Sequence, residues 1–538
     1  MIKLLLGNEA LAQGAIDAGI SGVYSYPGTP STEITEYIQK SKTAKELNIH
    51  SKWSVNEKTA MEAALGMSYA GKRAMTVMKH VGLNVAADVF MNMSISGING
   101  GLVVVVADDP SMHSSQNEQD SRNYGRFAMI PILEPSNQQE VYDITKYAFY
   151  LSEQMGLPIM IRMVTRLSHS RTGIEVSERK LQNKINLPKT PHQFQLIPIY
   201  ARNRYQHLIE IQTDSKESSE NSLFNKYIDG PNTSIGIIAS GIAYNYVLEN
   251  FEDDKCPYPI LKISQYPLPK KQVKKIFDKC KKILVLEDGA PFIEELVSDY
   301  FSEHKKVIGR LTGHVNRVGE LNPDNIANAL GFNDKITEDI PSIVTGRPPE
   351  LCVGCAHRDL FEAINKLKKE NSQQQVFGDI GCYALGVLPP YESINTLIDM
   401  GASINMAKGA SDAGIHPSIA IIGDSTFTHS GMTGLLDAVI ENSPITVIIS
   451  DNSAVAMTGA QDSAASGRLI NICKGIGVDK NHLKIITPLH KNLDKNIDII
   501  RNEINYKGTS VVIAQRPCVQ LSKDKKDKIK KEQQMILN

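Results

Sequence analysis

Two short stretches near the end of the chain constrain its fold most strongly. Ile-Ile-Gly-Asp-Ser-Thr (421–426) and Ile-Ile-Ser-Asp-Asn-Ser-Ala (448–454) each begin with apolar residues and end abruptly in small and acidic ones. In a parallel α/β sheet, a buried strand has this pattern where its C-terminal end reaches a ligand site. The separation between Asp424 and Asn452 suits one helix and one strand, so a right-handed crossover would place both residues at neighbouring strand ends.

The polar atoms at these two strand ends are hard oxygen donors. A carboxylate from Asp424, an amide oxygen from Asn452 and a backbone carbonyl suit Mg²⁺ shared with a diphosphate better than zinc or a soft metal. Two ordinary strand ends followed by a polar turn explain the same residues equally well. From these stretches alone, the metal site is a hypothesis.

The composition excludes several classes of protein. The chain has 538 residues, 41% of them hydrophobic and 22% charged, which is typical of a soluble globular protein with several domains. A net charge of −1 gives no electrostatic reason to expect nucleic acid or an anionic membrane as a partner. No stretch approaches the ~18 apolar residues of a membrane span, and the N-terminal apolar run is too short for a signal peptide. Seven cysteines fit reduced thiols, so a cytoplasmic protein is predicted.

The pattern along the chain predicts three α/β domains. Residues 1–175 alternate between helix and strand, and residues 231–344 and 345–520 do so again. Between the first two, residues 176–230 lose periodicity and are predicted to form an irregular, exposed linker. Residues 521–538 form a charge run, predicted to be a solvated tail.

Three loops of the first domain carry candidate functional residues. The loop at 26–32 contains two prolines and a glycine, and its Thr29 could bind a carboxylate, although a rigid turn is the simpler interpretation. Asn56 is a plausible N-cap that places Glu57 in the first turn of a helix, and Gly82 follows a strand end. The loop after the buried strand at 101–107 contains His113, a candidate catalytic group, although such loop residues are usually only solvated.

The third domain contains glycine-rich turns at further strand ends. Cys-Val-Gly-Cys-Ala-His (352–357) and Gly-Asp-Ile-Gly-Cys (378–382) could approach a phosphorylated ligand through their backbone N–H groups. The pair Cys352 and Cys355 has no second pair at the spacing of a zinc site and lacks the four-cysteine run of an iron–sulfur site. Neither a Gly-x-Gly-x-x-Gly dinucleotide motif opening a βαβ unit nor a P-loop is present.

Stretches distributed along the whole chain together resemble one known family. They are Tyr-Pro-Gly-Thr-Pro-Ser-Thr (26–32), Asn-Glu-Lys (56–58), residues 107–120, Ser-Gly-Ile-Ala-Tyr-Asn-Tyr (240–246), Arg-Val-Gly-Glu-Leu (317–321), Gly-Asp-Ile-Gly-Cys-Tyr (378–383), Ile-Gly-Asp-Ser-Thr-Phe (422–427) and Ala-Met-Thr-Gly-Ala-Gln (456–461). In this order they resemble the large (alpha) subunit of indolepyruvate:ferredoxin oxidoreductase, in the 2-oxoacid:ferredoxin oxidoreductase superfamily.

This resemblance implies a fold and a cofactor. Residues 1–175 would be a pyrimidine-binding domain, residues 231–344 a transketolase-C-like domain and residues 345–520 a diphosphate-binding domain, all doubly wound. Thiamine diphosphate would be bound with Mg²⁺, whose ligands would be Asp424, Asn452 and the carbonyl of Ala454. The full set of implied cofactor-binding residues is Glu57, Gly82, Cys355, His357, Gly378, Asp379, Gly381, Cys382, Gly423, Asp424, Ser425 and Asn452.

The resemblance also implies catalytic roles. Glu57 would hydrogen-bond N1′ of the aminopyrimidine ring and so favour the tautomer that removes the C2 proton of the thiazolium. Thr29 matches the superfamily's contact with the carboxylate of the 2-oxo acid. The implied partners are a second copy of the chain, a smaller beta subunit, a separate ferredoxin and, as a co-substrate, CoA.

Two departures from the family leave the reaction type open. Val353 and Ala356 replace two prolines of the family's cysteine motif, and the family's C-terminal ferredoxin-like domain is not found after Cys518. No iron–sulfur cluster is therefore expected in this chain. Either the protein passes electrons to clusters on another polypeptide, or it is a non-oxidative decarboxylase or carboligase of 2-oxo acids (aryl or branched pyruvates). A non-catalytic scaffold is disfavoured because Glu57, Asp424 and Asn452 are all present.

Overall fold

The computed structural model describes the chain except for residues 302–305, 333–340, 347, 528 and 530–538. The chain divides into two units, Met1–Asp339 and Ile340–Asn538. The division lies close to the predicted start of the third domain at residue 345, whereas the first two predicted domains form one unit. Most of the predicted charged tail lies outside the described residues.

The first sheet of the first unit is built mainly from residues 1–175. Its strands run in the order β12-β6-β7-β5-β4-β2-β3, all parallel except β12, which pairs antiparallel with β6. Every residue of β5 is buried, as its run of valines requires for a central parallel strand. The strands are β2 (Gly22–Ser25), β3 (His50–Trp53), β4 (Ala74–Lys79), β5 (Leu102–Asp108), β6 (Ile132–Leu133), β7 (Ile159–Val164) and β12 (Gln265–Tyr266).

Helices cover both faces of this sheet, and loops at its edge carry shorter ones. One face packs against α1 (Gly7–Asp17), α2 (Thr32–Lys40) and α8 (Gln138–Met155), and the other against α4 (Glu57–Tyr69) and α6 (Ala87–Ser96). The shorter helices are α3 (Lys42–Glu46), α5 (His80–Val85), α7 (Arg122–Phe127) and α9 (Thr165–His169), and β1 (Ile2–Leu6) pairs with β8 (Arg171–Glu175).

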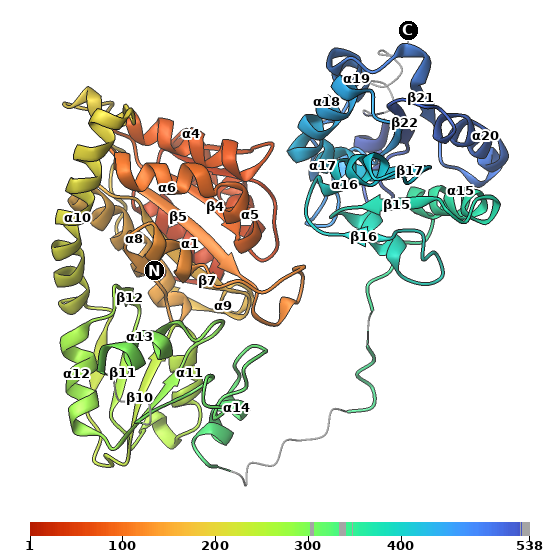
Figure 1. Ribbon diagram of the computed structural model, residues 1–538. Coiled ribbons are helices and arrows are strands. Elements are labelled where there is room, and N and C mark those ends of the chain that lie inside the picture. The colour runs from red at the N-terminus through yellow and green to blue at the C-terminus, as the bar shows by residue number, and fades with distance from the viewer. Residues whose placement is uncertain (302–305, 333–340, 347, 528, 530–538) are drawn as a thin grey trace. The chain divides into compact units, whose positions relative to one another are not determined.

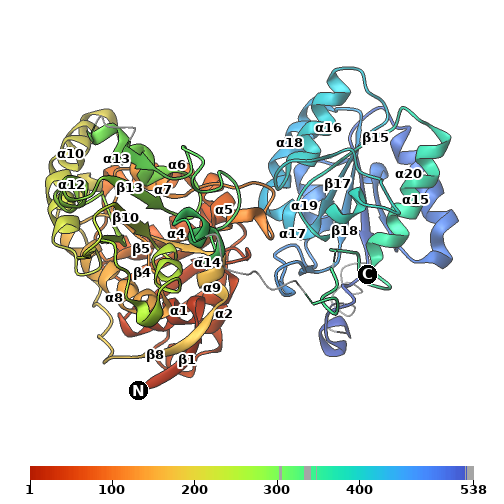
Figure 2. The same ribbon diagram turned by 90° about the horizontal axis from the view of Figure 1, so that it is seen from below.

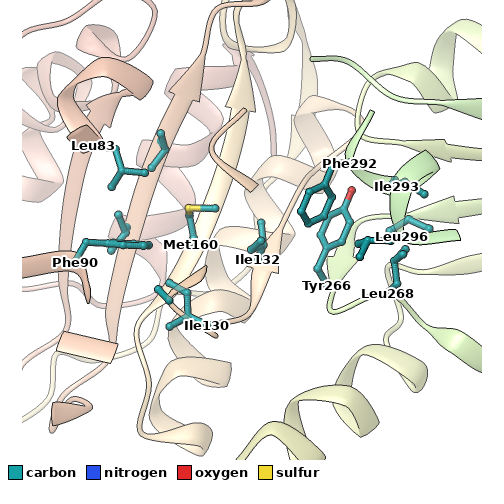
Figure 3. Packing of buried hydrophobic residues seen from close by; sticks show 14 of the residues in the cluster. Leu83, Phe90, Ile130, Ile132, Met160, Tyr266, Leu268, Phe292, Ile293 and Leu296 are labelled. Carbon is teal, nitrogen blue, oxygen red and sulfur yellow. The ribbon is translucent and has the colours of Figure 1, made fainter. Parts of the chain in front are cut away.

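The second sheet shares its core with the first. Its strand order is β14-β13-β10-β11-β9. One buried cluster runs from Phe90 on α6 and Met160 on β7 to Tyr266 on β12 and Phe292 on α13, as Figure 3 shows. Because β12 also joins the first sheet directly, these two predicted domains pack as one body. The elements are β9 (Lys226–Ile228), β10 (Ile235–Ser240), β11 (Ile260–Ile263), β13 (Lys282–Leu286), β14 (Val307–Ile308), α11 (Ala243–Leu248), α12 (Lys270–Lys279), α13 (Phe292–Phe301) and α14 (Pro323–Ala329).

The prediction of an irregular linker at 176–230 is wrong in part. This segment contains α10 (Pro198–Glu220), a helix of 23 residues that contacts α6, α8 and α12 and so lies along both sheets of the first unit (Figure 1). Only Leu208, Ser215 and Ser219 on it are buried. So few buried positions, two of them serines, leave almost no apolar period for a sequence pattern to reveal.

The third sheet has the doubly wound architecture expected of the diphosphate-binding domain. Its order is β16-β15-β17-β18-β22-β21, all parallel. Helices α15 and α20 cover one face and α16, α18 and α19 the other (Figure 2). The elements are α15 (Ala356–Glu370), β15 (Gln375–Gly378), β16 (Thr396–Leu397), α16 (Ala402–Asp412), β17 (Ser418–Gly423), α17 (Asp424–Thr426), α18 (Met432–Glu441), β18 (Ile445–Asp451), β19 (Ala454–Val455), β20 (Gln461–Asp462), α19 (Leu469–Ile476), β21 (Leu483–Ile486), α20 (Leu493–Ile504) and β22 (Ser510–Gln515).

Three α/β sheets therefore confirm the predicted fold class. Among the helices described, none combines the length and the apolar character needed to cross a membrane.

Candidate cofactor-binding and active site

The two strands that dominate the sequence pattern are neighbours in the third sheet. β17 and β18 pair in parallel, with Gly423 opposite Ser450, so Asp424 and Asp451 emerge at the same edge. Asp424 begins α17 and Asn452 follows β18. The predicted crossover and the predicted neighbouring strand ends are both confirmed.

Asp424 is a buried carboxyl group with an unsatisfied oxygen. Its Oδ2 has no hydrogen-bond partner among the described residues. Burial, together with the nearby carboxyl of Asp451, raises the pKa of Asp424 to about 8. Two buried carboxyl groups side by side are unfavourable unless a proton or a cation compensates their charge. The arrangement is suited to holding a cation.

Asn452 occupies the turn that follows β18. Its Oδ1 accepts a hydrogen bond from the backbone N–H of Ala454 at 3.0 Å, which shapes the turn, and Ser453 between them has a positive φ of 59°. The amide oxygen keeps a second lone pair. The carbonyl of Asn452 accepts from Cys518 N at 2.9 Å, which ties the turn to the segment after β22.

The turn after β15 is held next to the start of α17. The hydroxyl of Thr426 donates to the carbonyl of Ile380 at 3.0 Å, and a Cβ built on Gly423 would lie 2.7 Å from the ring of Tyr383. A Cβ on Gly381 would lie 2.4 Å from the same ring. Glycine is required at both positions because the aromatic ring fills the space that a side chain would occupy. The predicted Gly378–Cys382 turn and Asp424 are thus brought together.

Asp379 shapes this turn from within. Its carboxyl accepts hydrogen bonds from the Ser403 hydroxyl at 2.7 Å, from Gly401 N at 3.2 Å and from the Tyr383 hydroxyl. Burial raises the pKa of Asp379 to about 7, although these donors oppose the shift. These contacts show that hydrogen-bond donors of the protein already bind the Asp379 carboxyl. They do not test the predicted cofactor-binding role of Asp379.

His357 connects the cysteine loop to the same edge. It lies in the first turn of α15, is buried, and its Nδ1 is 2.8 Å from the Ser450 hydroxyl at the end of β18. Burial lowers the pKa of His357 to about 4, so the imidazole is neutral at physiological pH. It can therefore exchange hydrogen bonds at this edge without adding a positive charge.

Four of the seven cysteines gather beside these residues. Burial raises the pKa of Cys382 to about 12, and the nearby thiols of Cys355, Cys518 and Cys352 and the Asp424 carboxyl contribute to this shift. Sequence pattern groups only Cys352 with Cys355, because Cys382 and Cys518 are remote from that pair along the chain. Cys382 and Cys518 each follow a strand of the same parallel sheet, and the sheet order brings them to the pair.

In the first unit, Glu57 lies where the sequence predicts. The side chain of Asn56 caps α4 by accepting from Thr59 N at 2.9 Å, and Glu57 is the first residue of the helix. Its buried carboxyl packs against α5, where a Cβ built on Gly82 would lie 2.5 Å from Glu57 Oε1. Gly82 thus leaves the space that the Glu57 carboxyl fills, and the two predicted residues form one feature.

The loops after β2 and β5 meet beside this feature. The hydroxyl of Ser114 donates to the carbonyl of Thr29 at 3.3 Å, which joins the loop at 26–32 to the loop that carries His113. His113 itself is 3.1 Å from Glu320 Oε2, from the loop that precedes α14. It borders a pocket of about 350 Å³ whose other lining residues are Thr165, Arg166, His169 and Ser170. A catalytic role for His113 remains a prediction.

Comparison with known proteins adds independent evidence to this geometry. Residues 13–222 match the family described as "Pyruvate flavodoxin/ferredoxin oxidoreductase, thiamine diP-bdg", and residues 379–493 match "Thiamine pyrophosphate enzyme, C-terminal TPP binding domain". The chain is 38% identical to indolepyruvate oxidoreductase subunit IorA of Archaeoglobus fulgidus, over 96% of this chain and 86% of the relative. It is 37% identical to the IorA subunits of Pyrococcus horikoshii and Methanothermobacter thermautotrophicus, over 96% of this chain and 85% and 86% of those relatives.

The two matched families cover a segment in each of the two units, and the relatives align with nearly the whole chain. The chain belongs to the family of indolepyruvate oxidoreductase IorA subunits, within the thiamine-diphosphate-dependent 2-oxo acid:ferredoxin oxidoreductases.

Proposed function

We propose that the protein is the thiamine-diphosphate- and Mg²⁺-dependent component of an oxidoreductase that acts on aryl or branched 2-oxo acids. The observation that carries the proposal is the buried pair of Asp424 and Asp451, with the unpartnered Oδ2 of Asp424, at the ends of two neighbouring strands. A hard divalent cation would compensate this charge, and it would accept the amide oxygen of Asn452 and the carbonyl of Ala454 as further ligands.

The turns around this pair suit a diphosphate. Gly381 and Gly423 present backbone without side chains, and the neutral His357 adds no charge at the same edge. Backbone N–H groups at Gly378 to Cys382 and at Ser425 would bind phosphate oxygens in such a place. Thiamine diphosphate, when bound, supplies an electron sink for the loss of CO₂ from a 2-oxo acid.

The chain's own contribution to proton transfer lies in the first unit. Glu57 is buried against Gly82, where its carboxyl is screened from water and held in one position. We assign to the Glu57 carboxyl the hydrogen bond to N1′ of the aminopyrimidine. In this position the carboxyl would hold the proton that it exchanges with the ring. Thr29, whose loop is fixed to the neighbouring loop through Ser114, would orient the carboxylate of the substrate.

The relatives' name supports a partner, because the IorA relatives are named as subunits of an oxidoreductase. We propose at least a homodimer that works with a smaller beta subunit and a separate ferredoxin, with CoA as the acyl acceptor.

The alternative function is a non-oxidative decarboxylase or carboligase. Incubating the purified protein with aryl 2-oxo acids, with and without CoA and a one-electron dye, separates the two. Strict dependence on the acceptor supports the oxidoreductase, and aldehyde or acyloin formed without it supports the alternative.

The metal assignment is tested by binding. Asp424→Ala should weaken Mg²⁺-dependent binding of thiamine diphosphate, measured by calorimetry with and without Mg²⁺. Asp412→Ala, which removes an exposed carboxylate of α16, is the matched control and should bind as the native protein does. Unchanged affinity in the Asp424 variant would remove this residue from the metal site.

The four cysteines that lie near one another favour a second candidate for electron transfer, an iron–sulfur cluster bound by this chain. The expectation that this chain holds no iron–sulfur cluster stays a prediction, but Cys352, Cys355, Cys382 and Cys518 supply four soft donors beside Asp424. Burial raises the pKa of both Cys355 and Cys382, so these thiols stay protonated unless a bound metal stabilises the thiolates. Iron and acid-labile sulfide in anaerobically purified protein, lost in Cys518→Ser and retained in Cys256→Ser, would establish a cluster.

A further inference from the structure

The last residue of β4 is a lysine at the middle of the first sheet's C-terminal edge. β4 lies between β2 and β5, and the loops after those two strands carry Thr29 and His113. Lys79 ends β4 immediately before α5, the helix that contains Gly82. The topology therefore places the Lys79 ammonium group between the loop that carries Thr29, the loop that carries His113 and the helix α5 that packs against Glu57.

Contacts hold the Lys79 side chain between these two loops. A Cβ built on Gly28 would lie 3.2 Å from Lys79 Cδ, so the aliphatic stem rests on the backbone of the Thr29 loop. The ammonium donates one hydrogen bond to the carbonyl of Ser114 at 3.2 Å. Because the hydroxyl of Ser114 donates to the carbonyl of Thr29, Lys79 completes a short connection between the two loops.

Three other basic side chains near this edge, Arg166, His113 and His169, each have a carboxylate partner. The guanidinium of Arg166 donates to Glu320 at 2.8 Å, and His113 contacts the same carboxyl. His169 lies 3.4 Å from Glu33. By contrast, the Lys79 ammonium forms no ion pair within 4.0 Å among the residues that the structure describes.

The acidic groups closest to Lys79 are engaged elsewhere. Asp109 accepts from the Thr165 hydroxyl at 2.7 Å and from Ser114 N and the Ser115 hydroxyl, both at 2.8 Å. Burial lowers the pKa of Lys79 to about 8, while the carboxylates of Asp109 and Glu57 act in the opposite direction. The amine is thus largely charged at neutral pH, poorly hydrated, and left with N–H donors that an added acceptor can satisfy.

We propose that the Lys79 ammonium binds the carboxylate of the 2-oxo acid, opposite Thr29. This inference rests on the proposed function, which it deepens by naming the group that selects an anionic substrate. Every 2-oxo acid carries this carboxylate whatever its side chain, so Lys79 recognises the class of substrate. A charge-assisted N–H···O bond in a poorly hydrated place also fixes the orientation of the neighbouring carbonyl.

The proposal is tested by comparing the binding of two ligands that the enzyme cannot turn over. The probes are an aryl 2-hydroxy acid, whose reduced carbonyl prevents turnover, and its uncharged methyl ester, titrated by calorimetry into the full chain. Lys79→Met keeps the length and the packing of the stem but removes the charge. It should weaken binding of the acid roughly tenfold or more, the magnitude expected for a hydrogen bond to a charged group, and leave the ester unchanged. Lys79→Arg should restore most of the affinity for the acid.

A matched control and a separate measurement make the outcome decisive. Lys40→Met removes the same charge from an exposed position on α2 and should bind both probes as the native protein does. The proposal is overturned if the Lys79 variant binds the acid as tightly as the native protein, if it loses acid and ester alike, or if the native protein does not distinguish the two. Thiamine diphosphate binding, measured on the same samples, reports independently on the proposed function.

Discussion

The guanidinium of Arg122 lies 2.9 Å from the carboxyl of Glu287, and both groups are buried, although Arg122 begins α7 beside the first sheet and Glu287 follows β13 of the second. Arg122 also donates from Nε to Asp120 at 2.9 Å. This contact lies next to the apolar cluster that continues from one sheet to the other. Charged and apolar contacts together explain why the first two predicted domains form a single unit.

Arg122→Met should destabilise the first unit strongly. The substitution leaves the buried carboxyl of Glu287 without its counter-charge and leaves Asp120 with only Arg162, at 3.6 Å. Breaking a buried pair from one side costs roughly 3–5 kcal/mol. Arg501→Met, which breaks an exposed pair with Glu370 on the second unit, should have little effect on stability. Urea unfolding of each variant, with hydrogen exchange in the unit that carries the substitution, measures the difference. Equal effects of the two substitutions would show that the buried pair contributes no more than a surface one.

Glu57→Ala should abolish exchange of the C2 proton of bound thiamine diphosphate while leaving cofactor binding detectable. The carboxyl is the one group at the start of α4 that can hold a proton for the aminopyrimidine, and Asn56, which caps the helix, is unchanged. Deuterium incorporation at C2, followed by proton NMR, is the measurement. Full exchange in the variant would remove Glu57 from its assigned role.

Gly82→Ala, a substitution on the neighbouring helix α5, should also impair exchange of the C2 proton. A Cβ at this position would lie 2.5 Å from Glu57 Oε1 and 2.7 Å from its Cγ, so the carboxyl must move. The control is Gly66→Ala on the same helix as Glu57, where no atom lies within 4 Å of the added carbon. That substitution should leave exchange unchanged and stabilise the helix by about 0.5–1 kcal/mol. If both alanine variants exchange normally, the space at Gly82 does not position Glu57.

The sequence could predict those parts of the site that depend on local pattern. A short apolar run that ends in Gly423 and Asp424 is the pattern of a buried parallel strand, and the next such run had to lie beside it because crossovers are right-handed and short. An N-cap such as Asn56 likewise marks the start of a helix and places Glu57 in its first turn, whereas the role of Glu57 came only from the family resemblance. Both inferences need only neighbouring residues and one topological rule.

The parts that the sequence could not predict depend on contacts between remote segments. Cys382 and Cys518 join the cysteine pair only when the third sheet forms, and Lys79 meets Gly28 and Ser114 only when β2, β4 and β5 are adjacent. The helix α10 was missed for the opposite reason, because so little of it is buried that its sequence carries no apolar period. Neither kind of feature leaves a local signal.

Asp379→Asn should change how the stability of the second unit depends on pH. Burial raises the pKa of this carboxyl from 3.8 to about 7, so the folded chain binds its proton more tightly than the unfolded chain does. The free energy of unfolding must then fall as pH rises from about 4 to about 7, by roughly 3–4 kcal/mol from this group, and level off above that range. An asparagine does not titrate, so the variant should lose this slope between pH 5 and 7. Urea unfolding in the presence of a chelator measures it, with the exposed Asp412→Asn as the control that should keep the native slope. A native slope in the Asp379 variant would mean that this carboxyl is already ionised in the folded protein, held so by Ser403, Gly401 and Tyr383.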